Sequence, residues 1–386
     1  MGSSVNISNF VDYIVTNAIR ARASDIHLEP DRDKFNVRFR IDGILYPIES
    51  FDSFSKEEIT SRIKILSQLD IAEHRFPQDG HFEYNFGEKI HNIRVSVLPT
   101  VDGEAIVLRI FNRNDIFIQI SSLGFDKSQL DLMNQLLTSP SGMILTTGPT
   151  GSGKTTLLYS ILHTFNKPER NIITLEDPIE FQMQGIRQTQ VNEAIGFNFA
   201  KAMRSVIRQD PDIVMLGEIR DADTAQMAIQ AALTGILVLS TFHTFDVPAL
   251  VTRLQEIGFS GSVVAQAVKA VISTRLLRRI CDKCKVEYEP SEEDKKILGK
   301  NPEKLYKGKG CEACLKKGYL GRTGIFQVVY FDQDLQSAIA DRKSVSEIHQ
   351  LITSKKIKSL RESAMDKVIS GETTLEELLR STGTLS

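Results

Sequence analysis

The sequence lacks the features of a secreted or membrane-embedded protein. Four cysteines in 386 residues are too few for a disulfide-stabilised secreted scaffold. The first residues have neither the basic nor the apolar region of a signal peptide. The stretch 224–245 contains no charged side chain, but its glutamines, threonines and histidine make it too polar for a transmembrane helix. We therefore expect a soluble protein of a reducing compartment.

The sequence also lacks an excess of charge of either sign. Its 47 basic and 49 acidic side chains give a net charge of −2 at pH 7. No overall positive field attracts a nucleic-acid backbone, so direct binding of nucleic acid is not expected. The hydrophobic content of 41% and the charged content of 25% are those of an ordinary folded protein, and the length predicts two or three domains.

Residues 1–111 have the pattern of a small α+β domain. Apolar side chains recur at helical spacing over 11–21. Three later stretches alternate apolar and polar residues with period two, at 37–41, 93–97 and 105–110. This alternation predicts a sheet that has an apolar face and an opposite face carrying Arg38, Arg40 and Arg94.

The pattern changes further along the chain. Residues 112–124 show no clear period, and we interpret them as a linker. Residues 125–386 alternate helices with short, continuous apolar runs, at 143–145, 172–175, 213–216 and 236–239. Apolar strands separated by helices predict a parallel sheet that is covered on both faces. The last stretch, 344–386, predicts C-terminal helices with capping boxes at 344–347 and 373–376.

A phosphate-binding loop is the strongest motif. The pattern G-x-x-x-x-G-K-[ST] is matched by Gly148, Pro149, Thr150, Gly151, Ser152, Gly153, Lys154 and Thr155, and Thr156 follows it. The glycines let backbone N–H groups close around a β-phosphate, and the helix that begins near Lys154 directs its positive end at the anion. Lys154 can reach the β- and γ-phosphates, and the Thr155 hydroxyl can ligate Mg²⁺. The alternative is a glycine-rich turn without a ligand; the strand predicted before the motif and the helix predicted after it favour the phosphate site.

Polar side chains follow three other predicted strands. These side chains are Glu176, Glu218 and His243. Ligands of open α/β sheets bind at the carboxyl ends of strands, so the three residues and the loop point to one crevice. Glu218 is the candidate general base, and Gly217 stands where an acid that holds Mg²⁺ is generally expected. The alternatives are a solvated acid and a histidine with a purely structural hydrogen bond.

Every cysteine belongs to one of two CxxC pairs. Cys281 and Cys284 form the first pair, Cys311 and Cys314 form the second, and 26 residues separate them. Four thiolates in two knuckles suit tetrahedral Zn²⁺, and four protein ligands leave no open position for chemistry. The pattern predicts a structural zinc subdomain over 281–314. A redox CxxC is the alternative, but it needs only one pair in thioredoxin-like surroundings.

Several arginines are candidates for contact with a transferred phosphoryl group, whose charge an NTPase commonly neutralises with an arginine. Arg94 and Arg109 lie in the first domain, and Arg204 and Arg208 lie one helical turn apart in the second. The alternative is that all four are solvated surface side chains.

Together these motifs resemble the assembly ATPases of bacterial type II secretion and type IV pili, within the secretion-ATPase group of P-loop proteins. Gly217 also fits this family's pattern. The similarity spans nearly the whole chain, through RASDIHLEP (22–30), the loop (148–156), ITLEDP (173–178), RQDPD (208–212) with 217–218, LSTFHT (239–244), both CxxC pairs, GRTG (321–324) and TTLEELLR (373–380).

The resemblance implies an α/β protein with two main domains. A PAS-like α+β N-terminal domain (1–111) precedes a RecA-like P-loop ATPase domain (125–386), which carries the four-cysteine zinc-binding insertion and a helical C-terminus. A homo-hexamer would bind ATP between the two domains, with Mg²⁺ and Zn²⁺ as further cofactors. The resemblance makes Glu218 the general base, with Glu176 and His243 assisting phosphate sensing and water positioning. It also implies that family arginines approach the nucleotide, some of them from a neighbouring domain or subunit; here these are Arg94, Arg109, Arg204 and Arg208.

The resemblance also implies a mechanical role. Hydrolysis would move the domains as rigid bodies, turn an inner-membrane platform protein and promote the addition of pilin-like subunits. The chain would be cytoplasmic, held at the inner membrane through partners that include a cytoplasmic recruiting protein. Assembly ATPases usually carry a further N-terminal domain, so a shortened chain is expected here. Two alternatives stay open: a pilus-retraction or DNA-handling ring ATPase, against which the cysteine pairs argue, and a nucleotide-dependent switch without turnover.

Overall fold

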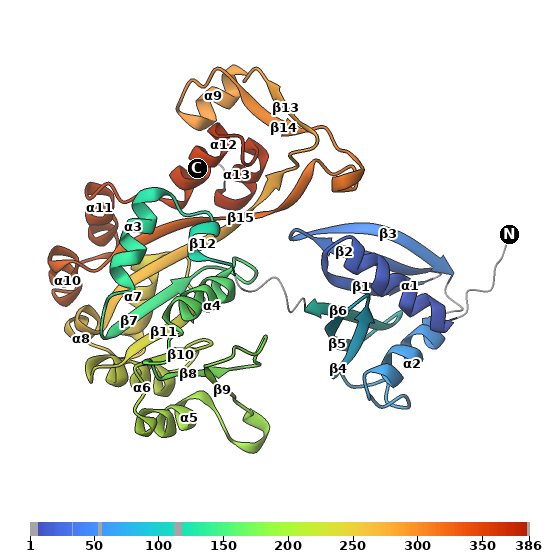
Figure 1. The fold of residues 1–386 in the computed structure, drawn as a ribbon, viewed down its shortest axis with the longest axis horizontal. Coiled ribbons are helices and arrows are strands. Elements are labelled where there is room, and N and C mark those ends of the chain that lie inside the picture. The colour runs from blue at the N-terminus through green and yellow to red at the C-terminus, as the bar shows by residue number, and fades with distance from the viewer. Residues whose placement is uncertain (1–6, 33, 53–55, 112–117, 384–386) are drawn as a thin grey trace. The chain divides into compact units, whose positions relative to one another are not determined.

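The computed structural model describes residues 7–32, 34–52, 56–111 and 118–383. The chain divides into two compact units, Met1–Asp115 and Ile116–Ser386, termed the smaller unit and the larger unit (Figure 1). Residues 112–117 of the expected linker lie outside the described residues. The rest of that segment packs within the larger unit, where Ile120 is buried and the Leu123 carbonyl accepts a hydrogen bond from the Gly324 N–H at 2.9 Å.

A six-stranded antiparallel sheet forms the framework of the smaller unit, in the order β3-β2-β1-β6-β5-β4. Its elements are α1 (Ile7–Arg20), β1 (Ala23–Asp31), β2 (Lys34–Ile41), β3 (Ile44–Asp52), α2 (Lys56–Leu66), β4 (Gln78–Phe86), β5 (Lys89–Thr100) and β6 (Gly103–Phe111). The three stretches with period two lie within β2, β5 and β6, so their prediction as strands is confirmed.

The two faces of this sheet differ in chemistry. Apolar side chains of the strands pack against α1 and α2 in one buried cluster, which includes Ile14 and Ile59. In β2, Phe39 and Ile41 are buried, whereas the intervening Arg40 lies on the other face and is partly exposed. The expected division into an apolar face and an arginine-bearing face is therefore present.

A seven-stranded sheet runs through the larger unit, in the order β15-β12-β7-β11-β10-β8-β9. Its strands are β7 (Gly142–Thr147), β8 (Ile172–Glu176), β9 (Arg187–Gln190), β10 (Ile213–Leu216), β11 (Leu237–Phe242), β12 (Val268–Ile280) and β15 (Tyr319–Tyr330). Neighbouring strands are parallel, except that β15 pairs with β12 in the antiparallel direction. The predicted parallel sheet is confirmed, with one antiparallel edge strand.

Both faces of the central strands are buried, which explains why β7, β8, β10 and β11 contain continuous apolar runs. In β7, Met143 and Leu145 belong to one core cluster, while Ile144 between them belongs to another. Helices α3 (Lys127–Leu136) and α4 (Lys154–Phe165) cover the Ile144 face. On the opposite face, α5 (Phe199–Val206), α6 (Ala222–Leu233) and α8 (Gly261–Ala267) contact the strands. Helices α7 (Val247–Glu256), α10 (Gln333–Ala340) and α11 (Val345–Ser354) complete the same core cluster, with α10 against α8 and α11 against α7.

The segment between β12 and β15 and the last helices form a further packed region. Its elements are β13 (Lys285–Tyr288), α9 (Glu292–Leu298), β14 (Leu305–Gly308), α12 (Leu360–Ile369) and α13 (Leu375–Thr382). Leu277 of β12, Leu305 of β14 and Leu378 of α13 share one buried cluster. Single 3₁₀ turns occur at Ile120–Ser122, Glu193–Ile195, Ile207–Gln209 and Glu312–Cys314. Within the described ranges, no helix has the length and apolar character needed to cross a bilayer.

One of the two predicted capping boxes is displaced. Ser344 and Glu347 form the expected box at the start of α11. At α13, however, Thr374 rather than Thr373 is the N-cap, and its hydroxyl accepts a hydrogen bond from the Glu377 N–H. The prediction for 373–376 is wrong because the Thr373 hydroxyl is buried and donates to the Arg278 carbonyl on β12 at 2.7 Å.

The Glu377 carboxylate ties α13 to β12. It is fully buried, and it accepts hydrogen bonds from the backbone N–H and Nε of Arg278, both at 2.8 Å, and from Nε of Arg380 at 2.7 Å. Burial alone would raise the pKa of Glu377, but the two guanidinium groups outweigh it and hold the pKa below its usual value.

We predict that Glu377→Gln destabilises the larger unit. Removing the carboxylate takes away the buried charge that pairs directly with Arg278, which costs about 3 kcal/mol of unfolding free energy. Because the pKa of Glu377 is lowered in the folded state, its contribution is present above the unfolded pKa of about 4.3 and is lost as the pH falls through the folded value. Urea unfolding at pH 7 and pH 3.5 measures both effects.

The matched control for this experiment is Glu376→Gln. The Glu376 side chain is 72% exposed and lies 3.5 Å from Arg278, so its loss changes stability by less than about 1 kcal/mol. Equal urea midpoints for the two variants at pH 7 would contradict the role assigned to Glu377.

Candidate ATP-binding site and cysteine cluster

The phosphate-binding loop connects β7 to α4. Gly148 follows β7 with φ at 148°, a conformation that residues with a side chain rarely adopt. A Cβ atom at this position would lie 2.7 Å from the Thr274 carbonyl oxygen and 2.5 Å from Ser152 Oγ. The Thr274 hydroxyl donates to the Ser152 carbonyl at 3.0 Å, so β12 supports the loop from behind. The glycine is therefore required by close backbone packing.

Lys154 is held within the loop. Its side chain is largely buried, and Nζ donates to the carbonyls of Gly148 at 2.7 Å and Pro149 at 3.1 Å. Burial lowers the pKa of Lys154, and the positive charge of Arg275 adds to this effect while Glu218 opposes it. A desolvated ammonium group paired only with neutral carbonyls is well suited to bind an anion.

A cavity of about 370 Å³ opens over the loop. Loop residues 150–156 line it, and side chains that follow three other parallel strands complete it: Glu176 from β8, Glu218 after β10 and His243 after β11. Because the strands are parallel, all four carboxyl ends lie at the same edge of the sheet. Gly148 and Pro149 lie behind the cavity and support Lys154 through their carbonyls.

Glu218 lies between two basic side chains. One carboxylate oxygen is 2.9 Å from Nε2 of His243, and the other accepts a hydrogen bond from Nη2 of Arg220. Burial would raise the pKa of Glu218, but the hydrogen bond and charge of Arg220, together with His243, lower it overall. Glu218 is thus an oriented carboxylate that lines the cavity.

Glu176 is more enclosed than Glu218. Its side chain is 3% exposed and accepts hydrogen bonds from the hydroxyls of Tyr159 and Thr174 and from the Gln188 amide. Burial raises the pKa of Tyr159, and the Glu176 charge raises it further, so the phenol remains a donor. These contacts connect the helix that follows the loop with β8 and β9.

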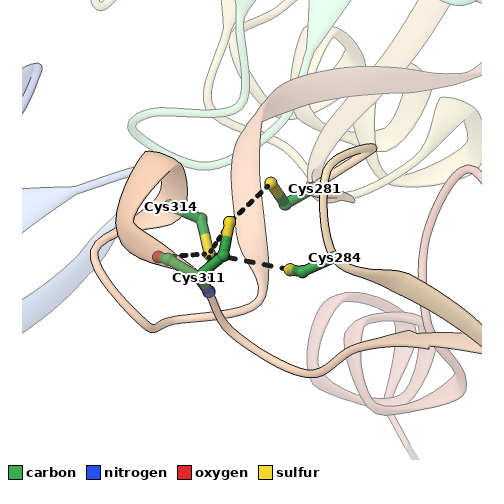
Figure 2. A group of neighbouring side chains, drawn as sticks. All are labelled: Cys281, Cys284, Cys311 and Cys314. Atoms are coloured by element: carbon green, nitrogen blue, oxygen red, sulfur yellow. Dashed lines mark hydrogen bonds between the residues drawn. The ribbon is translucent and has the colours of Figure 1, made fainter.

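The four cysteine side chains converge on one point (Figure 2). All four Sγ atoms lie within 4.8 Å of one another, and the distances are 3.9 Å for Cys281–Cys311, 3.8 Å for Cys284–Cys314 and 3.8 Å for Cys311–Cys314. A tetrahedral site with Zn–S bonds of about 2.3 Å has S–S edges of about 3.8 Å. The donor set therefore fits a zinc ion.

Backbone amides support this cluster. The N–H groups of Cys311 and Gly318 point at the sulfur of Cys314, at 3.1 Å and 3.2 Å. Burial would raise the pKa of Cys314, but these N–H groups lower it to about 7, whereas burial raises the pKa of Cys284 to about 12. A bound cation would stabilise the thiolate form of all four residues.

The sequence matches the family described as Type II/IV secretion system protein over residues 2–380. It is 43% identical over 383 residues to the type IV pilus assembly ATPase PilB of Myxococcus xanthus, covering 97% of this chain and 68% of that protein. It is 41% identical over 379 residues to the type II secretion system ATPase E of Vibrio cholerae, covering 97% of this chain and 75% of that protein. The chain belongs to this family.

The family assignment confirms the resemblance seen in the sequence and makes the chain a P-loop ATPase. The solved structure of the ATPase DotB from Legionella pneumophila has the same fold, with a TM-score of 0.72 at 20% identity over 98% of this chain and 96% of that one. The expected α/β fold class, with its cysteine cluster and helical C-terminus, is confirmed. The family implies ATP and Mg²⁺ as ligands.

The four candidate arginines lie outside the cavity walls. Arg204, on α5, and Arg208, in the turn after it, are exposed, and Nη1 of Arg208 donates to the Arg204 carbonyl at 2.8 Å. Arg94, on β5, and Arg109, on β6, belong to the smaller unit. The larger unit taken by itself does not bring any of the four to the phosphate-binding loop.

The motifs assign no role to Arg322 and Tyr159, which line the cavity, or to Arg220, which contacts Glu218 without lining the cavity itself. Arg220 donates a hydrogen bond to Glu218. Its position two residues after Glu218 is the sequence feature that could have suggested this contact. Arg322 is on β15 and Tyr159 is on α4. Arg322 lies in the GRTG segment, but the sequence does not show that the pairing of β15 with β12 brings it to the cavity, and Tyr159 lies a helical turn beyond the phosphate-binding motif.

We predict one zinc ion per chain, released by Cys281→Ser. Loss of one thiolate opens the tetrahedral site, and the segment between the cysteine pairs loses its cross-link. Metal analysis and thermal unfolding of purified protein measure both effects. Lys283→Ala, in the same knuckle but without a ligand atom, is the control and should retain zinc. Well under one zinc per unmodified chain would contradict the assignment.

Proposed function

We propose that this chain is the ATPase of a machine that assembles a type II secretion pseudopilus or a type IV pilus, and that it hydrolyses ATP in the cavity over the loop. One observation carries the proposal: the oriented carboxylate of Glu218 and the buried ammonium group of Lys154 meet at the edge of one parallel sheet. A protein that only binds nucleotide has no need for a carboxylate held in this way.

The residues of the cavity have separate tasks in this proposal. Lys154 and the loop N–H groups bind the phosphates, with Lys154 exchanging the carbonyls of Gly148 and Pro149 for phosphate oxygens. Thr155 lines the cavity and supplies a hydroxyl ligand for Mg²⁺, which neutralises phosphate charge when bound. Glu218 accepts a proton from the attacking water, and His243 orients the carboxylate.

Glu176 contributes indirectly. Its carboxylate accepts three hydrogen bonds from protein donors, which suits it to hold the cavity wall in shape and to sense the phosphate through Tyr159. The proposal therefore gives it a supporting part in phosphate sensing and water positioning rather than proton transfer.

The four arginines complete the site in a ring of identical chains. Arg204 and Arg208 are exposed, so they are available to the nucleotide site of a neighbouring chain. Arg94 and Arg109 supply positive charge from the smaller unit, since a transferred phosphoryl group is stabilised by such side chains. A homo-hexamer with sites completed by neighbouring chains fits all of these placements.

The relatives suggest where such a ring would act. One is named for type IV pilus assembly and another for type II secretion. We therefore propose a cytoplasmic ring held at the inner membrane by a recruiting partner. Hydrolysis would move the two units against each other as rigid bodies and turn a platform protein in that membrane. The net charge of −2 gives the chain no general attraction for nucleic acid.

We predict that two cavity variants separate binding from turnover. Lys154→Ala should weaken Mg·ATP binding at least about tenfold, because it removes the principal phosphate contact. Glu218→Gln should bind Mg·ATP normally and lose about 10²- to 10⁴-fold in kcat, the usual range for a general base. Binding of a fluorescent ATP analogue and phosphate release measure the two effects.

The control for these variants is Glu169→Gln, which changes an exposed acid outside the cavity walls. It should keep both properties. Hydrolysis by Glu218→Gln at the rate of unmodified protein would remove that residue from its assigned role.

A mixing experiment tests completion of the site by a neighbouring chain. Glu218→Gln and Arg204→Gln rings should each be inactive alone. If the arginine acts across chains, an active site needs an unmodified Glu218 from one chain and an unmodified Arg204 from its neighbour. In rings mixed randomly from equal amounts of the two variants, about a quarter of the sites meet this condition, and activity returns. Phosphate release after dissociation and reassembly measures this recovery. Mixed rings that stay as inactive as the single variants would place both residues in the same chain's site.

A further inference from the structure

Charged side chains form a continuous row across the sheet of the smaller unit. The strand registers pair Arg40 with Asp25, Asp25 with Arg109, Arg109 with Arg94 and Arg94 with His81. Directly paired residues on neighbouring strands share one face, so the five side chains lie side by side across β2, β1, β6, β5 and β4. This face is the one that α1 and α2 leave uncovered by apolar packing.

The row is unbalanced in charge. It contains three arginines but a single carboxylate, that of Asp25. Arg109 and Arg94 are directly opposite each other, although like charges in this arrangement repel. The Arg94 guanidinium lies over the Phe111 ring, 4.3 Å from its centroid, which holds it in place beside Arg109.

Asp25 is the buried member of the row. It is 4% exposed, and Arg109 Nε donates to one of its carboxylate oxygens at 2.8 Å. The other oxygen accepts the Ser24 hydroxyl at 2.8 Å and lies 3.7 Å from Arg40 Nε. Both oxygens are therefore engaged, and the carboxylate cannot rotate without breaking a hydrogen bond.

This contact uses only one edge of the Arg109 guanidinium. Nε binds Asp25, and among the described residues no acceptor is present for the two Nη groups. The side chain remains 58% exposed despite the ion pair. Arg109 is thus held at its base through Nε, and its Nη donors are left for another acceptor.

We propose that Asp25 is a positioning residue for ATP hydrolysis, which fixes Arg109 so that its Nη groups meet the phosphates. This inference rests on the proposed role of Arg109 as a phosphate-contacting arginine. A long arginine side chain loses rotamer freedom when it binds an anion, and the Asp25 hydrogen bond reduces that loss by ordering the guanidinium beforehand. Asp25 contacts neither the nucleotide nor the reacting atoms in this proposal.

The test compares Asp25→Asn, Arg109→Gln and the double variant in the full chain, assembled with Mg·ATP. Asp25→Asn keeps the side-chain shape and removes the charge that holds Arg109. We expect kcat to fall on the order of tenfold with KM for ATP nearly unchanged, as for an interaction made mainly in the transition state. Active sites are titrated with a fluorescent ADP analogue, so that unfolded chains do not count as slow ones.

The double variant separates positioning from a purely structural role. If Asp25 acts through Arg109, adding Asp25→Asn to Arg109→Gln should lower kcat less than twofold further. Asp42→Asn is the matched control, because it removes the same charge from the same unit at a hairpin position whose partner, Arg22, is 3.7 Å away. It should keep full activity.

Each other outcome has a definite meaning. Normal kcat in Asp25→Asn, with Arg109→Gln impaired, would overturn the role of Asp25 and leave the function of Arg109 intact. Normal kcat in Arg109→Gln would instead overturn the proposed role of Arg109 itself. A tenfold loss from Asp25→Asn in both backgrounds, or a fall in titrated sites without a fall in kcat per site, would show a structural role only and reject positioning.

Discussion

The parallel direction of the central strands is the constraint on which the cavity depends. Strands β7, β8, β10 and β11 are apolar on both faces, and helices on both sides of the sheet remove those faces from water. Helical crossovers return the chain to the same edge each time, so every strand ends where the phosphate-binding loop begins. The convergence of Lys154, Glu176, Glu218 and His243 is a consequence of how the apolar residues are buried.

Residues in a motif of known chemistry could be given a role from the sequence. Arg322 and Asp25 could not, although both lie in segments that resemble the family, 321–324 and 22–30, because distant pairing decides their contacts. The loop, Glu218 and the two CxxC pairs each combine a short motif with a strand or knuckle, so local sequence was sufficient to mark them. Arg322 enters the cavity through the antiparallel pairing of β12 with β15, and Asp25 meets Arg109 through the pairing of β1 with β6. Such registers depend on the whole sheet. The displaced cap at Thr374 has the same origin, because a contact with β12 decides which threonine is free to cap the helix.

The cysteine cluster lies at the ends of a segment that is not part of the main sheet. The segment between the pairs has only two short strands and one short helix, too little apolar surface to fix its own ends. A cation bound by the four sulfurs would cross-link both ends of that segment, which burial alone does not do. The Arg278–Glu377 contact then attaches the last helix to the strand that leads into the cluster.

Among the described residues, Glu377, Glu218, Glu176 and Asp25 are carboxylates that contact basic or hydroxyl donors, and their surroundings decide what each pairing achieves. Glu377 is enclosed on all sides by α13 and β12, so its pairing with Arg278 and Arg380 can only affect stability. Glu218 has the same kind of basic neighbours but lines a cavity, so lowering its pKa keeps a proton acceptor charged where substrate can reach it. Glu176 lines the same cavity but accepts hydrogen bonds from three protein donors, which fix its place in the cavity wall. Asp25 stands between these cases: it is buried, yet its hydrogen-bond partner Arg109 is exposed, so Asp25 can act on a ligand through that arginine. Access to the carboxylate or to its partner, rather than the ion pair itself, therefore distinguishes a chemical role from a structural one.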